Sequence, residues 1–289
     1  MSVVDRPTPD GADVIDIVRD RVRRLGRAQV VASDLDGTLL RTDGTVSERT
    51  RAAWAAAEEA GLSTVLVTAR PPRWLDDLES IVGAHGVALC GNGAFVYDVP
   101  SRTVVAQHGF DLSAVALIVG DLRRELPGIV FGAERRTGLS LDDGYHSDYP
   151  VPAGAVRGPV EALTGEPVGK LLARHPHLGD EAFRARVAQV VGERGIVAYS
   201  GAGGLAEISA PGVTKAAALA QWCADLGVPA SGVWAFGDMP NDLPMLAWAG
   251  TGVAVGNGHA DVVSAADLVT AGNDDDGVAR VLEHLLPTP

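Results

Sequence analysis

The sequence SDLDGTLL occupies residues 33–40 and follows the apolar run VVA at residues 30–32. It places two carboxylates, Asp34 and Asp36, at the end of a predicted buried strand and directly before a glycine. In extended backbone, residues i and i+2 project to the same side of the strand. The two negative charges would therefore share a small space and repel each other, unless a cation or a bound proton relieves them.

Three interpretations of this stretch compete. An Asp-x-Asp-Gly sequence often forms a simple tight turn, because Asp and Gly suit turns. A calcium loop fits the spacing poorly, since Gly37 follows the second Asp directly and apolar residues stand where further oxygen ligands are needed. A cation beside the pair would instead make one carboxylate a placed nucleophile and leave the other free for proton transfer. The stretch alone does not separate the turn from the catalytic site.

The composition narrows the class of protein. The formal net charge of −13 opposes binding to a nucleic-acid backbone, which needs a basic surface, and disfavours anionic membrane surfaces. No apolar run reaches transmembrane length, and the N-terminus lacks the apolar centre of a signal peptide. Cys90 and Cys223 show no disulfide or zinc spacing and are expected to be small core residues. We therefore expect a cytoplasmic protein without nucleic-acid or membrane partners; its oligomeric state is left open.

Apolar strand patterns alternate with helical patterns in two separate parts of the chain. The predicted strands include 29–34, 63–68 and 87–90 in the first part, and 205–209 and 233–236 in the second. Continuous apolar strands that alternate with helices predict a parallel sheet with both faces covered. The predicted fold class is therefore α/β, with a doubly wound, parallel-sheet core of Rossmann-like type.

The block between these two parts does not show this alternation of strands and helices. It contains short strand-like segments, two helical patterns and long loops rich in Gly, Pro and Asp, which together indicate an inserted α+β module. The predicted organisation is an N-terminal tail and helix at 1–27, a first core part at 28–97, the inserted module at 98–200 and a second core part at 201–289.

Polar residues follow the ends of the predicted core strands. Thr68 ends one strand with Arg70 just beyond it, and the sequence GDMPND at 237–242 follows another. Lys215 begins the helix after 205–209 and is one of two lysines, with Lys170, among 24 basic residues. Each of these residues alone fits an ordinary strand, surface or capping role. Because ligands bind at the carboxyl ends of the strands in open α/β sheets, their joint placement predicts one site.

The residue types at these strand ends suit phosphoryl transfer. Asp34, Asp238 and the backbone carbonyl of Asp36 are oxygen donors of the kind that Mg²⁺ prefers. Such a cation lets an anionic nucleophile approach an anionic phosphate. Thr68 and Lys215 would bind the phosphoryl oxygens and stabilise the charge that spreads over them.

Four motifs carry a resemblance to a known family: DLDGTLL at 34–40, VTAR at 67–70, GVTK at 212–215 and GDMPND at 237–242. In order and spacing they resemble those of the haloacid dehalogenase-like (HAD) hydrolases, in the Cof-type branch of metal-dependent phosphatases. The resemblance covers residues 28–286. Ala69 stands where the branch usually has Gly, while Thr68 keeps the contact.

The resemblance implies a role for each matching residue. Asp34 would be the nucleophile that forms an aspartyl-phosphate, and Asp36 would protonate the leaving alkoxide and then deprotonate water. The remaining assignments are Asp238 completing the Mg²⁺ site with Asp34 and Asp36, Asp242 and Arg70 as supporting residues, and Thr68, Lys215 and Asn241 holding the phosphate.

The resemblance also implies that the block at 98–200 is a C2-type α/β cap, which closes over the site, excludes water and selects the substrate. Lys170, Arg174, His146 and Arg136 are candidate cap residues, although no motif supports them. A lone His or Arg in a loop more often lies on the surface. Lys170 opens an apolar strand, so a structural role fits it equally well.

The resulting hypothesis is a Mg²⁺-dependent phosphatase that acts on a small phosphorylated metabolite such as a sugar phosphate. One alternative is a phosphosugar mutase, which returns the phosphoryl group from the same aspartyl-phosphate to a sugar. Another is a binding protein that kept the fold without activity. That alternative predicts the loss of a catalytic residue, and none is missing.

Overall fold

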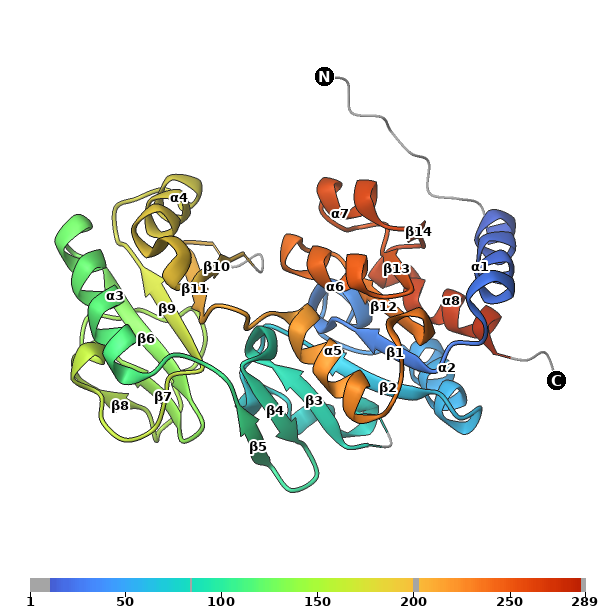
Figure 1. Ribbon diagram of the computed structural model, residues 1–289, viewed down its shortest axis with the longest axis horizontal. Coiled ribbons are helices and arrows are strands. Elements are labelled where there is room, and N and C mark those ends of the chain that lie inside the picture. Colours follow the sequence, from blue (N-terminus) through green and yellow to red (C-terminus); the bar gives the residue numbers. More distant parts are fainter. Residues whose placement is uncertain (1–10, 84, 200–202, 287–289) are drawn as a thin grey trace, which may run out of the picture.

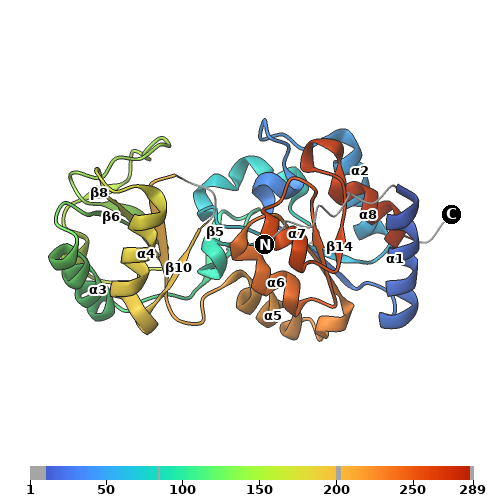
Figure 2. The same cartoon turned by 90° about the horizontal axis from the view of Figure 1, so that it is seen from above.

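Two sheets form the framework of the protein. The computed structural model describes residues 11–83, 85–199 and 203–286. Figures 1 and 2 show the two sheets side by side, joined by the segments that follow β5 and β11. The first sheet has the strand order β14 (Leu268–Val269), β13 (Thr251–Ala254), β12 (Val233–Gly237), β1 (Val30–Ser33), β2 (Ser63–Val67), β3 (Val87–Cys90), β4 (Phe95–Asp98) and β5 (Thr103–Gln107).

The first sheet is parallel from β14 to β3, and β4 and β5 extend it antiparallel at one edge. Side chains of β1 alternate between two apolar clusters, with Val30 packing on one face and Val31 on the other. Helices cover both faces, which confirms the predicted α/β class. The helices are α1 (Gly11–Leu25), α2 (Glu48–Glu59) and α8 (Gly277–Leu285) on one face, and α5 (Lys215–Asp225), α6 (Leu243–Trp248) and α7 (Ala260–Ala265) on the other.

The second sheet is mostly antiparallel. Its strand order is β10 (Ile196–Ala198), β11 (Leu205–Ser209), β9 (Lys170–Arg174), β6 (Val130–Arg135), β7 (Gly138–Leu141) and β8 (Val156–Arg157). Helices α3 (Leu112–Glu125) and α4 (Asp180–Val191) pack on one face of this sheet around a core that includes Phe131, Leu171 and Ile208. The other face is turned toward the first sheet and supplies residues to the cavity described below.

Two strands, β5 and β11, lie in a different sheet from the one that the predicted domain boundaries imply. The sequence predicts residues 205–209 as a core strand, but β11 pairs with β9 and β10 in the second sheet, because Ala206 and Ile208 pack into the α3–α4 cluster. Conversely, β5 lies beyond the predicted boundary at 97/98 and pairs with β4 in the first sheet. The chain therefore leaves the first sheet after β5 and returns to it after β11.

The N-terminal helix α1 is part of the main body. Val18 is fully buried, and the guanidinium of Arg21 donates to the carbonyl of Gly250 at 3.2 Å and to Asp267 at 2.6 Å. Of the predicted N-terminal tail at 1–12, residues 1–10 lie outside the described residues, and residues 11 and 12 begin α1. None of the helices in the described residues is long and apolar enough to cross a membrane.

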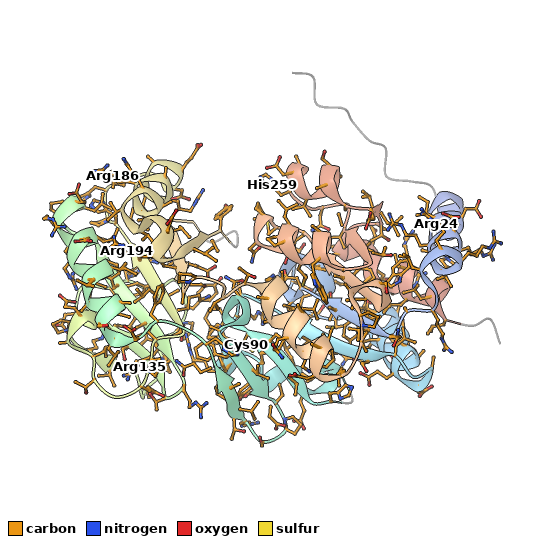
Figure 3. The ribbon with its side chains drawn as sticks, in the orientation of Figure 1. Arg24, Cys90, Arg135, Arg186, Arg194 and His259 are labelled. Atoms are coloured by element: carbon orange, nitrogen blue, oxygen red, sulfur yellow. The ribbon has the colours of Figure 1, made fainter. Side chains whose placement is uncertain are left out.

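Both cysteines are buried core residues, as their spacing predicted. Cys90 lies on β3 within the first sheet, where Figure 3 labels it. Burial raises the pKa of the Cys223 thiol to about 12, so this thiol is unreactive at neutral pH.

Candidate active site

The turn after β1 brings two loops of the first sheet into contact. The backbone N–H of Asp34 donates to the carbonyl of Phe236 at 3.0 Å, which aligns the ends of β1 and β12. Gly37 then turns the chain with a φ of +78°, and a Cβ at this position would collide with the carboxylate of Asp238. Glycine is therefore required both by the backbone angle and by the approach of Asp238.

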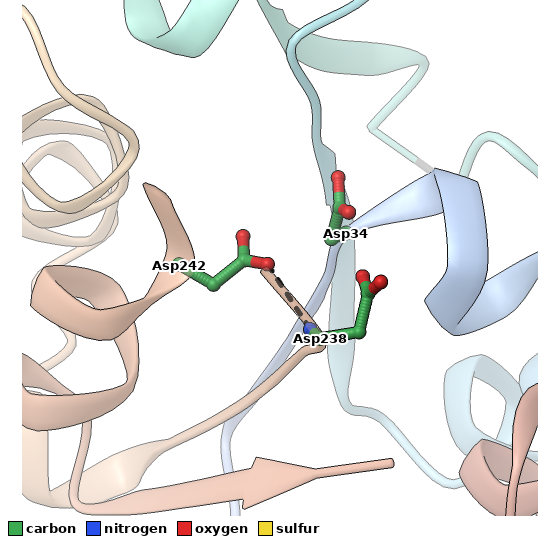
Figure 4. Close-up of side chains that lie close together, drawn as sticks. All are labelled: Asp34, Asp238 and Asp242. Carbon is green, nitrogen blue, oxygen red and sulfur yellow. Dashed lines mark hydrogen bonds between the residues drawn. The ribbon is translucent and has the colours of Figure 1, made fainter. Parts of the chain in front are cut away.

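Three buried carboxylates and one ammonium group gather at this point. The carboxylate oxygens of Asp34, Asp238 and Asp242 lie within 4.8 Å of one another. The Nζ of Lys215 lies 2.7 Å from Asp34 Oδ1 and 2.6 Å from Asp242 Oδ1. Figure 4 shows the three carboxyl groups, which come from the end of β1 and from the segment after β12.

This cluster carries more negative than positive charge. Burial raises the pKa of Asp34 well above its ordinary value, against the opposing effect of Lys215. Burial also raises the pKa of Asp238 to about 6, although a hydrogen bond from Thr38 opposes the shift. Burial alone would lower the pKa of Lys215, but Asp242 and Asp34 outweigh it and raise that pKa. A divalent cation would relieve the excess negative charge, so the donor set fits Mg²⁺.

Asp242 stabilises the loop after β12 that carries Asp238 and Met239. One of its oxygens binds Lys215, and the other accepts the backbone N–H groups of Asp238 at 3.1 Å and Met239 at 2.9 Å. Its side chain is fully buried and does not line the cavity, whereas Asp34 and Asp238 do. The structure thus leaves Asp34 and Asp238 as the carboxylates available to a metal or a substrate.

Arg70 binds Asp36, the second aspartate of the DLDGTLL motif. Its guanidinium donates two parallel hydrogen bonds to the Asp36 carboxylate, at 2.8 and 2.6 Å. The backbone N–H of Arg70 donates to the hydroxyl of Thr68 at 3.0 Å. Thr68 itself is fully buried and lies behind the cavity wall, so in this structure its hydroxyl shapes the loop that presents Arg70.

A cavity of about 730 Å³ lies between the two sheets, over this cluster. The predicted site residues that line it are Asp34, Asp36, Arg70, Lys215, Asp238 and Asn241. Of the four candidate cap residues, Lys170 and Arg174 line this cavity. His146 lines a separate cavity of about 320 Å³, and Arg136 lines neither of the two.

The second sheet contributes to the cavity through alternate residues. Along β9, Lys170, Leu172 and Arg174 face the cavity, while Leu171 and Ala173 face the α3–α4 core. Alternation of this kind is a property of the extended strand and is visible in the sequence once the strand is identified. The candidates Lys170 and Arg174 are thus brought together by strand periodicity.

A chain of hydrogen bonds that no sequence motif indicates joins the two sheets. Asn92, with a φ of +60°, accepts from the amide of Asn241 at 3.1 Å and donates to Glu207 at 3.5 Å. Glu207 also binds Lys170 at 2.6 Å, and Lys170 donates to the carbonyl of Ala69 at 2.8 Å. The one signal in the sequence was the Gly-Asn-Gly turn at 91–93, which favours a left-handed backbone.

Two further contacts across the sheets had no signal in the sequence. Arg73, on the loop after β2, forms an ion pair with Glu134 of β6. Trp74 packs on Tyr149, with ring centroids 4.5 Å apart. All four side chains line the cavity, so its wall is built jointly by the two sheets.

Fold and site together define a class of enzyme: an open α/β sheet with an inserted cap and an acidic, metal-ready centre at its strand ends. A family model for haloacid dehalogenase-like hydrolases matches residues 31–282. The chain belongs to this family, in its Cof-type branch, and is a phosphoric monoester hydrolase by class. The predicted resemblance is thereby confirmed.

Relatives with known names share almost the full length of the chain. A 5-amino-6-(5-phospho-D-ribitylamino)uracil phosphatase of Bacillus subtilis is 30% identical over 269 residues, covering 88% of this chain and 96% of that protein. A pyridoxal phosphate phosphatase of Escherichia coli is 27% identical, covering 89% of this chain and 99% of that protein. These relatives act on small phosphorylated metabolites.

Solved structures share the fold. A HAD phosphatase, BT1666 from Bacteroides thetaiotaomicron, superposes with a TM-score of 0.76 at 24% identity, over 90% of this chain and 95% of that one. The HAD sugar phosphatase BT4131 superposes with a TM-score of 0.72 at 21% identity, over 89% and 98% of the two chains. Their similarity supports the architecture of core and cap.

Proposed function

We propose that the protein is a Mg²⁺-dependent phosphatase that hydrolyses a small phosphorylated metabolite, such as a sugar phosphate, through an aspartyl-phosphate on Asp34. The observation that carries the proposal is the buried cluster of Asp34, Asp238, Asp242 and Lys215 at the end of a 730 Å³ cavity. The names of the relatives support the substrate class.

The proposed reaction has two steps. A carboxylate oxygen of Asp34 attacks the phosphorus and the bond to the leaving oxygen breaks, while Asp36 gives that oxygen a proton. Asp36 then takes a proton from water, which attacks the aspartyl-phosphate and releases inorganic phosphate with Asp34 restored. Arg70 fixes the orientation of the Asp36 carboxylate through its paired hydrogen bonds.

The other residues hold the phosphate and position the groups around it. Lys215 offers an ammonium group beside Asp34, and Asn241 lines the cavity with an amide that Asn92 orients. The hydroxyl of Thr68 accepts the backbone N–H of Arg70 and so shapes the loop at the end of β2. Asp34, Asp238 and the backbone carbonyl of Asp36 would hold Mg²⁺, which would offset the negative charge that the carboxylates and the phosphate bring together.

The test is the Asp34→Asn variant, assayed with p-nitrophenyl phosphate in the presence of Mg²⁺. We expect the loss of hydrolysis to be on the order of a thousandfold or more, because no nucleophile remains. EDTA should abolish the wild-type activity. Asp225→Asn, at the exposed end of α5, is the matched control and should behave as wild type.

Unchanged hydrolysis in Asp34→Asn would contradict the proposal. With a hexose phosphate as substrate, release of inorganic phosphate is expected. An isomerised sugar phosphate in its place would identify the protein as a mutase.

A further inference from the structure

The cations on the cavity wall are already neutralised by protein carboxylates. Arg73 binds both oxygens of Glu134, one of them at 3.0 Å, and the Glu134 side chain is only 4% exposed. Glu134 lies directly opposite Lys170 across β6 and β9. The Arg73 guanidinium is therefore engaged in a two-point ion pair at the junction of the sheets.

Lys170 is also bound to a protein carboxylate. Its side chain is 2% exposed, and its Nζ binds Glu207 at 2.6 Å and the carbonyl of Ala69 at 2.8 Å. A buried ammonium without a carboxylate is strongly unfavourable, so the ion pair with Glu207 stabilises Lys170 at the cavity wall. Little of its charge is left for a ligand.

The remaining cations have partners as well. Arg174 pairs with Asp148, and Arg70 pairs with Asp36. Lys215, which pairs with Asp34 and Asp242, belongs to the acidic centre that would take the ester phosphate itself. Among the described residues that line the cavity, no Lys or Arg lacks a carboxylate partner. Among the described carboxylates that line the cavity, Asp238 is the one without an ion pair, and it belongs to the acidic centre where the phosphate and the metal would bind.

The rest of the wall is neutral. It offers hydroxyl groups from Tyr145, Ser147 and Tyr149, and apolar surface from residues such as Leu139 and Leu172. Such a lining can bind hydroxyls and carbon–hydrogen surface. A second phosphate or a carboxylate on the substrate would either displace a protein carboxylate from its cation or stay desolvated without a partner.

From this pairing we infer that the substrate is a monophosphate ester whose leaving group is uncharged and hydroxylated, with no second anionic group. The inference rests on the proposed phosphatase function and adds to it the charge of the leaving group. Arg73–Glu134 and Lys170–Glu207 act as specificity pairs: each carboxylate withholds a cation from anionic substrates.

The experiment compares two substrates with the same carbon chain. Sorbitol 6-phosphate ends in a neutral CH₂OH group, and 6-phosphogluconate ends in a carboxylate at the same place. We expect the wild type to prefer sorbitol 6-phosphate in kcat/KM by on the order of tenfold or more, because the carboxylate finds no partner in the cavity. The ratio of the two values does not depend on how much of the enzyme is folded.

The variants Glu134→Gln and Glu207→Gln release Arg73 and Lys170 from their carboxylates. Each should lower the preference for sorbitol 6-phosphate several-fold, since a freed cation can bind the substrate carboxylate. A purely structural role of these residues would reduce both activities equally and leave the ratio unchanged. Glu161→Gln, in an ion pair with Arg123 away from the cavity, is the matched control and should keep the wild-type ratio.

A wild type that prefers 6-phosphogluconate, or a ratio unchanged in both variants, would overturn the inference while hydrolysis of p-nitrophenyl phosphate still supports the proposed function. Absence of hydrolysis of all three esters would instead overturn the proposed function, and this inference with it.

Discussion

Lys215 supplies the positive charge that holds the carboxylates of the acidic centre together. It sits between Asp34, from the end of β1, and Asp242, from the segment after β12, and it is only 1% exposed. A compact ammonium with three donors fits between two carboxylates, whereas the planar guanidinium of Arg demands a wider fork. The scarcity of lysine in the sequence therefore pointed to a real constraint, and the second lysine, Lys170, is also buried against a carboxylate.

Replacing Gly37 by Ala adds one Cβ atom beside Asp238 and tests the geometry of this centre. We expect Gly37→Ala to cost about 1–2 kcal/mol of folding stability, because Ala is strained at a φ of +78°. Its Cβ would also push the Asp238 carboxylate aside. The variant should therefore lose phosphatase activity, and it should also lose the rise in melting temperature that we expect Mg²⁺ to give the wild type.

Gly44→Ala is the matched control. Gly44 has a φ of +81°, but nothing lies within 4 Å of a Cβ added there. We expect the same loss of stability with activity and the Mg²⁺ effect retained. Equal activity in the two variants would show that the contact with Asp238 is unimportant.

The motifs predicted which residues gather at the acidic centre. They did not predict the individual contacts that each of these residues makes. Asp34, Lys215 and Asp238 converge, because parallel strands end at the same edge of the sheet. Thr68, expected at the phosphate, is fully buried, and its hydroxyl accepts the N–H of Arg70. Glu207 could not be assigned a role, because its partner, Lys170, lies on a strand whose pairing no local pattern reveals.

At the scale of elements, most strands and helices were visible in the sequence, but the sheet to which a strand belongs was not. Apolar alternation marks β11 as a strand equally well in either sheet. Its place in the second sheet follows from packing against α4 and from pairing with β9, both of which are long-range contacts. The two strands assigned to the wrong part, β5 and β11, are those next to the crossings between sheets.

Helix α1 lies before the start of the family match at residue 31, and yet it is packed onto the main body. Val18→Ala should lower the free energy of unfolding by about 1–3 kcal/mol, through lost apolar burial and a small cavity. Urea unfolding measures this change. Phosphatase activity below the transition should stay at the wild-type value, because α1 does not reach the cavity.

Arg19→Ala, exposed on the same helix, is the control and should change stability by less than about 0.5 kcal/mol. If both variants unfold like the wild type, α1 contributes nothing measurable to the stability of the main body.

At the scale of the whole molecule, the sheets meet through contacts that surround the cavity. Lys170 reaches the carbonyl of Ala69, Asn92 reaches Glu207, and Trp74 packs on Tyr149. Each contact joins a loop of the first sheet to the second sheet or its loops, so cap position and site geometry are coupled. None was predictable from sequence, because each depends on how the two sheets are placed relative to each other.

The contact between Trp74 and Tyr149 can be weakened without touching a charge. Aromatic pairs contribute about 0.5–1.5 kcal/mol, so Tyr149→Ala should reduce the fraction of molecules with the cap closed. We expect a larger radius of gyration in solution scattering and a KM raised about two- to tenfold for a sugar phosphate. Tyr149→Phe keeps the ring and should restore the radius of gyration to that of the wild type. A radius and KM in Tyr149→Ala equal to those of the wild type would mean that the other contacts between the sheets hold the cap closed without this pair.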